Sequence, residues 1–207
     1  MKRLFSLYDT FPDRITADGR EYRLTLWFDR VLRFISLSDD GEHTPEETVD
    51  AGFAWLVDCP KPPPFEVRER VLRRVIDEII APPKRRLSSR KKPQRAVDFD
   101  FDAAEIYASF MRDYGIDLIK EQGRLHWCAF SALFDGLSEN TPIKQIMRIR
   151  AEAIPAPTSG NMEYIRRLTE LKTLYALPAK NAPQTTQDSG WNGLFDMLLA
   201  NAEKGGG

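Results

Sequence analysis

The chain has 207 residues, of which 42% are hydrophobic and 29% charged, and its formal net charge is −1. This length allows one domain or two small ones, and the near-neutral charge argues against a protein whose whole surface attracts nucleic acid. No apolar run approaches the roughly 20 residues of a membrane span, and Cys59 and Cys128 are too far apart for a metal-binding motif. We expect a soluble, cytosolic protein with two free thiols, no metal and no other cofactor.

The N-terminal third is predicted to form a β-hairpin followed by helices. Residues 15–22 contain Asp18 and Gly19, a dipeptide typical of a two-residue hairpin turn. Thr44 begins a capping-box sequence, which favours a helix start at that point. Apolar residues at helical spacing predict helices over 24–37, 44–57 and 67–79.

The composition changes after two prolines at 82 and 83. Serines and a proline within the following stretch predict a flexible linker between two helical lobes. Binding of an acidic protein partner is an alternative, and binding of nucleic acid is another. The stretch has no interleaved aromatic residue, which argues against single-strand binding. It carries seven basic residues and no acidic one: Lys84, Arg85, Arg86, Arg90, Lys91, Lys92 and Arg95.

The stretch 98–137 is predicted to contain two helices at the centre of the fold. Asp102 and Glu105 stand in capping-box order before the first helix, and Gly115 supplies the stop. The second helix is apolar on more than one side, so we expect it to be buried. Its aromatic residues are Trp127, Phe130 and Phe134.

Two more helices are predicted, the first opening at Thr141–Pro142 and ending before Pro155, the second running over 161–175. The stretch 179–189 is polar and contains proline, so we expect a mobile tail. A short amphipathic segment over 191–199 follows, with Trp191 and Phe195 on its apolar side.

Asp98, Asp100 and Asp102 begin like a calcium-binding loop. That loop needs glycine at its sixth position and glutamate at its twelfth, and here those positions hold Ala103 and Ser109. The spacing therefore does not predict a metal site. We expect Phe99 and Phe101 to face inward from an extended lead-in to the helix.

No residue pattern favours an enzyme. His126 has no second titratable residue with which to form an acid–base pair, so we interpret it as packed and hydrogen-bonded. Cys128 lies on the most apolar stripe, where burial raises the pKa of a thiol and makes it unreactive. The chain contains no nucleophile elbow and no phosphate-binding glycine loop.

Five strings in the second half carry a family resemblance: YASFMRDYGIDL, LHW, ALFDGLSENT, IMRIR and LKTLYALP. In this order they resemble tailed-phage (siphophage) tail assembly chaperones encoded near the tape-measure gene. The resemblance is best over 97–178, and its motifs concern packing rather than catalysis. Cys128 departs from the pattern, in which another aromatic residue follows Trp127.

The resemblance implies a non-enzymatic protein of the host cytoplasm, absent from the mature virion. Its expected partner is the tape-measure protein, with the tail-tube protein and a second copy of the chain as further candidates. A structural minor tail or connector protein of the virion is one alternative function. A nucleic-acid-binding regulator that uses the basic run is another.

We therefore predict a mainly α fold with two helical lobes and a small N-terminal β-hairpin. The predicted divisions are a lobe at 1–83, the basic linker at 84–97, a second lobe at 98–178 and a tail at 179–207. We expect contacts with a partner to come from aromatic and basic residues in three of these parts. The candidates are Trp127, Phe130, Phe134, Trp191, Phe195, Arg85, Arg86, Lys91 and Lys92.

Overall fold

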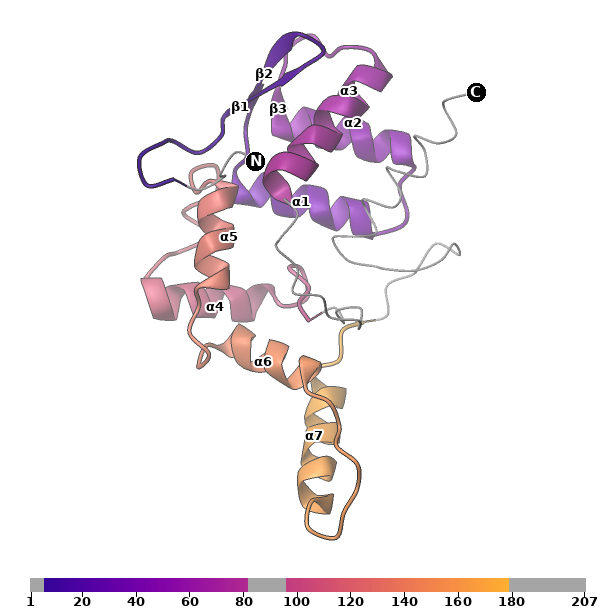
Figure 1. Ribbon diagram of the computed structural model, residues 1–207, viewed down its shortest axis with the longest axis vertical. Helices are drawn as coiled ribbons and strands as arrows, with labels where there is room; N and C mark the ends of the chain where they lie inside the picture. The colour runs from indigo at the N-terminus through magenta and orange to yellow at the C-terminus, as the bar shows by residue number, and fades with distance from the viewer. Residues whose placement is uncertain (1–5, 82–95, 179–207) are drawn as a thin grey trace. The chain divides into compact units, whose positions relative to one another are not determined.

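A computed structural model describes residues 6–81 and 96–178 (Figure 1). The described chain is mainly helical, with a small three-stranded antiparallel sheet near the N-terminus, and this confirms the predicted fold class. It divides into two compact units. The first contains 6–81 and 121–133, and the second contains 96–120 and 134–178. The sequence assigns 121–133 to the second lobe, whereas the structure clusters these residues with the first unit.

The hairpin of the first unit consists of β1 (Arg14–Ala17) and β2 (Arg20–Leu24), which pair antiparallel. Asp18 and Gly19 have φ angles of 51° and 74°, as a tight turn with two left-handed residues requires, so the predicted turn is confirmed. A third strand, β3 (Val57–Asp58), pairs with β2. The sequence places Val57 at the end of a helix. Instead it leaves α2 in an extended conformation and lies opposite Leu24.

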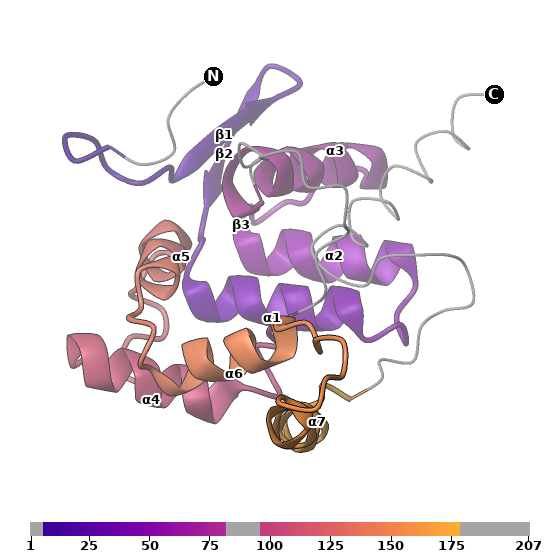
Figure 2. The same ribbon diagram turned by 60° about the horizontal axis from the view of Figure 1, so that its bottom comes forward.

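Three helices pack beside this sheet: α1 (Phe28–Asp39), α2 (Pro45–Leu56) and α3 (Phe65–Val75). Figure 2 shows α2 lying between α1 and α3, both of which it contacts. The capping box at Thr44 is present, so the predicted start of α2 is confirmed. Helix α1 begins four residues later than predicted, because Leu24 belongs to β2. After α3 the chain makes a π-helical turn, η1 (Ile76–Ile80).

Gly52 allows the three helices to approach closely. A Cβ atom at this position would lie 2.5 Å from Cε2 of Phe34 and 2.9 Å from Cδ2 of Leu72. Phe34 and Leu72 are themselves almost fully buried, at 0% and 1% exposure. There is therefore no free volume into which either side chain could move. Gly52 marks the point of tightest packing in the first unit.

The segment 121–133 joins the first unit through backbone and aromatic contacts. The Trp127 amide donates to the Leu26 carbonyl at 2.7 Å, and the Phe28 amide donates to the Leu125 carbonyl at 3.0 Å. The indole N–H of Trp127 donates to the Ile80 carbonyl at 3.2 Å. The Phe130 ring stacks on Phe28 with centroids 4.9 Å apart. These contacts bury the first part of α5 (Trp127–Asp135) in the core of the first unit.

The second unit contains α4 (Ala103–Tyr114), α6 (Pro142–Ala151) and α7 (Met162–Leu174). Gly115 ends α4 in the left-handed conformation, as predicted. The core combines residues from all three helices, while most of α7 stays accessible, with only Leu168 buried along it. The buried apolar residues of these helices are Ile106, Phe110, Ile143, Ile146 and Leu168.

The predicted capping role of Asp102 is wrong. Asp102 stands at the N-cap position of α4 but makes no side-chain cap hydrogen bond. Its carboxylate instead accepts two hydrogen bonds from the Arg150 guanidinium, at 2.6 and 2.7 Å. Arg150 also donates to the carbonyls of Tyr175 and Ala96. One buried arginine thus joins the beginning of the second unit, α4, α6 and the residue after α7.

The lead-in to α4 also differs from the prediction. Residues 98–102 form turns rather than an extended strand, because the Asp98 carboxylate accepts hydrogen bonds from the amides of Asp100 and Phe101. Phe101 consequently faces solvent, with 54% exposure, while Phe99 is half-buried and contacts Phe134.

Candidate partner-binding surfaces

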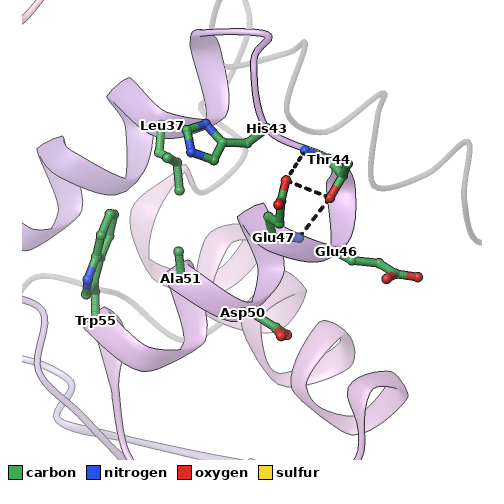
Figure 3. A pocket seen from close by; sticks show the side chains of 8 residues that line it. All are labelled: Leu37, His43, Thr44, Glu46, Glu47, Asp50, Ala51 and Trp55. Carbon is green, nitrogen blue, oxygen red and sulfur yellow. Dashed lines mark hydrogen bonds between the residues drawn. The ribbon is translucent and has the colours of Figure 1, made fainter.

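A hollow of about 560 Å³ lies in the first unit, beside the end of α1 and the start of α2 (Figure 3). Figure 3 shows Leu37 and His43 on one side of it, facing Ala51 and Trp55 on the other. The capping box fixes its upper edge, since the Glu47 carboxylate accepts from the Thr44 amide at 2.8 Å. The remaining lining residues are Thr44, Glu46, Glu47 and Asp50.

The edge of this hollow is acidic. Hydrogen bonds with Thr44 lower the pKa of Glu47, so that its carboxylate is charged at neutral pH. Burial acts to raise the pKa of Asp40, but hydrogen bonds from Glu42 and His43 outweigh it and lower that pKa. Residues 34–60 contain seven acidic residues and neither lysine nor arginine. An acidic edge over an apolar floor suits a basic, amphipathic surface on another molecule.

Two of the acidic groups are already engaged within the chain. Asp50 pairs with Arg68 at 3.0 Å, and Asp40 contacts His43 at 2.9 Å. The indole of Trp55 lies under the Arg33 guanidinium, 5.8 Å from it. These contacts hold the side chains around the hollow in place. The described residues contain no group of three or more side chains that could hold a metal ion.

The second unit carries a different kind of surface, because most of the exposed large apolar side chains in the described residues belong to it. Leu174 is 69% exposed, Met162 57% and Tyr164 48%. In the described part of the first unit, such residues are confined to Leu7 and Tyr8. The set in the second unit consists of Phe101, Met111, Tyr114, Ile119, Ile154, Met162, Tyr164 and Leu174.

The structure places the predicted partner-binding residues in two groups. Trp127, Phe130 and Phe134 are buried, with 3%, 1% and 8% exposure. They pack against other parts of the chain, so binding of a partner through them stays a prediction that requires local opening. The other six lie outside the described residues: Trp191, Phe195, Arg85, Arg86, Lys91 and Lys92.

His126 and Cys128, at the start of α5, are packed as the sequence predicts. Burial raises the pKa of the Cys128 thiol to about 11, so the thiol is protonated at neutral pH. Burial also lowers the pKa of His126, although the Pro12 carbonyl and the Asp13 carboxylate act in the opposite direction. The His126 ring stacks on Phe11 with centroids 4.9 Å apart.

The residues around the hollow were not candidates from the sequence. The signal that could have identified them is the acid-only stretch 34–60, which contrasts with the basic run that follows. Even so, the apolar part of the lining, formed by Leu37, Ala51 and Trp55, depends on how α1 and α2 pack. The periodicity of the sequence does not predict the angle between these two helices. On α7, Tyr164 and Leu168 have helical spacing in the sequence, but the structure buries only Leu168.

A comparison with known protein families gives a match over most of the chain. The family described as "Bacteriophage Gp15 protein" matches residues 7–177 and so covers both units. No curated protein and no solved structure matches the chain. None of the described helices combines the length and the apolar character needed to cross a membrane. Since the match extends over most of the sequence, the chain belongs to the Bacteriophage Gp15 protein family.

Proposed function

We propose that this protein is a tail assembly chaperone of a long-tailed phage, and that it binds the tape-measure protein and keeps it soluble while the tail tube assembles. The observation that carries the proposal is membership of a bacteriophage family over 7–177, which favours a structural or assembly role. The resemblance of the strings in 97–178 to tail assembly chaperones supports the more specific function. The protein then acts in the host cytoplasm and leaves the particle before maturation.

The distribution of exposed apolar side chains supports binding of a helical partner. A protein that keeps a long, aggregation-prone helical chain in solution needs apolar surface of its own. The second unit offers it along α7, through Met162 and Leu174, and at the end of α4, through Met111 and Tyr114. Charged residues such as Arg166 and Glu163 stand between them on α7 and keep this surface soluble.

Co-expression tests the proposal. The tape-measure protein of the same phage should be soluble with this chain and precipitate without it. A double substitution, Met162→Glu with Leu174→Glu, should leave the fold intact because both side chains face solvent, yet it should reduce the soluble fraction. The matched control is Thr169→Glu with Thr173→Glu, which adds the same charge at two exposed polar positions of the same helix and should leave the soluble fraction unchanged. If the tape-measure protein has the same solubility with and without this chain, the chaperone function is wrong.

Mass spectrometry of purified virions separates this function from its nearest alternative. A chaperone should be absent from the mature particle, whereas a minor tail or connector protein should be present in a fixed copy number. Binding assays with the tail-tube protein and sedimentation of the chain alone test the two further partners, the tube subunit and a second copy.

A further inference from the structure

His126 caps the N-terminus of α5. Its carbonyl accepts the first helical hydrogen bond, from the Phe130 amide at 3.0 Å. Its ring Nδ1 accepts a hydrogen bond from the Cys128 amide at 3.1 Å. A side chain that binds an amide of the first turn in this way satisfies a donor that has no partner in the helix. We propose that His126 is a pH-sensitive cap, and that its protonation releases the first turn of α5 from the first unit.

Only the neutral ring can fulfil this role. Nδ1 accepts the Cys128 N–H through its lone pair, so in the neutral ring the proton resides on Nε2. An added proton binds to Nδ1 and converts the acceptor into a donor, which leaves the Cys128 amide without its partner. The imidazolium charge also lies at the positive end of the helix, where a cation is unfavourable.

The first turn of α5 holds several parts of the first unit together. Trp127, the residue after the cap, donates from its amide to Leu26 and from its indole to Ile80. The ring of His126 also stacks on Phe11 in the N-terminal segment. Loss of the cap therefore weakens the attachment of 121–133 to both the segment that leads into α1 and the π-helical turn after α3.

Burial outweighs the surrounding charges and so determines the direction of the pH effect. Asp13, in the N-terminal segment, favours the protonated ring, but burial has the larger effect and lowers the pKa of His126. On the α1 side, the Asp29 carboxylate accepts from the Gly123 amide at 2.9 Å. On α5 itself, the Cys128 thiol is neutral. The Pro12 carbonyl, also in the N-terminal segment, favours the protonated ring as well.

Acid consequently favours the open form. In the open form, His126 is hydrated and binds a proton at its ordinary pKa of about 6.5. In the packed form, its pKa is lower. Between about pH 6.5 and the lower value the open form binds more protons, so the attachment of α5 weakens as the pH falls.

Amide hydrogen exchange on the full chain, followed by NMR, tests this proposal. Protection factors of Cys128, Ala129 and Phe130, corrected for intrinsic exchange, should fall roughly tenfold between pH 7.5 and 5.5, the factor expected for loss of a helix cap. His126→Asn should keep the protection at both pH values, because the asparagine side chain caps a helix independently of pH. His126→Ala should show low protection at both.

His43→Asn is the matched control, since His43 is exposed and belongs to the hollow rather than to α5. This variant should retain the pH dependence. Nitrogen chemical shifts of the imidazole supply an independent readout, in which the neutral ring of His126 carries its proton on Nε2. The proposal is overturned if that proton is on Nδ1, if the acid-induced loss of protection persists in His126→Asn, or if the wild-type protein shows no such loss.

Discussion

Removal of the Asp102 carboxylate should destabilise the second unit more than any other single change to a charged group in the described residues. Asp102 is 2% exposed and Arg150 6%, so Asp102→Ala leaves a buried guanidinium without its counter-charge. Breaking a buried pair from one side costs about 3–5 kcal/mol. In the variant, the Arg150 guanidinium still donates to two carbonyls, those of Tyr175 and Ala96. We therefore expect a loss of stability near the lower end of this range, about 3 kcal/mol.

Hydrogen exchange of the amides in α4 and α6 measures this cost in the second unit alone, which matters because the two units need not unfold together. Replacing both partners, as Asp102→Leu with Arg150→Met, should cost much less than the single change, since no charge remains buried. Asp50→Ala is the matched control, with its cost measured from exchange of the amides in α2 and α3, because the Asp50–Arg68 pair is partly exposed and should contribute about 0–1 kcal/mol. A cost for Asp102→Ala as small as that of the control would refute the reasoning.

Four further predictions concern stability and reactivity. Gly52→Ala should destabilise the first unit by about 1–2 kcal/mol in urea unfolding, because overpacking outweighs the gain in helix propensity, and a more stable variant would contradict the close packing described. Thr44→Ala should cost about 1 kcal/mol in the same assay through loss of the capping box, while Thr44→Ser should restore the parent stability. Phe130→Ala should cost about 3–5 kcal/mol, whereas unchanged stability would mean that the ring is not part of the core. At pH 8, iodoacetamide should modify Cys59 much faster than Cys128, because burial raises the pKa of Cys128 to about 11, and equal rates by mass spectrometry would show that Cys128 is accessible.

The parts of the fold that the sequence predicts correctly are those fixed by neighbouring residues. The Asp18–Gly19 turn, the capping box at Thr44 and the stop at Gly115 each depend on a few consecutive positions. The capping-box order at Asp102 is equally local, yet that prediction fails. Arg150, 48 residues away, offers the carboxylate a charge-assisted pair, and the backbone amide that the carboxylate accepts from is that of Asp98 rather than one in the first turn of α4.

The remaining differences also come from contacts between distant residues. Val57 forms a strand rather than the end of a helix because its backbone pairs with that of Leu24. The apolar stripe of α5 predicts burial but does not say against which unit, and the backbone contacts at Leu26 decide that question. The periodicity of the sequence likewise does not predict the hollow beside Trp55, because the hollow depends on how two helices pack.

The division of the chain into units has a consequence for synthesis on the ribosome. Residues 121–133 belong to the first unit, but they follow 96–120, which belong to the second. Phe28 therefore emerges long before Phe130, the ring on which it stacks. The first unit cannot complete its core until residue 133 has left the exit tunnel, and the second unit also needs residues beyond 133. Both units therefore complete their folding late in synthesis. A chain that ends within the basic run would lack Trp127 and Phe130, and with them part of the core of the first unit.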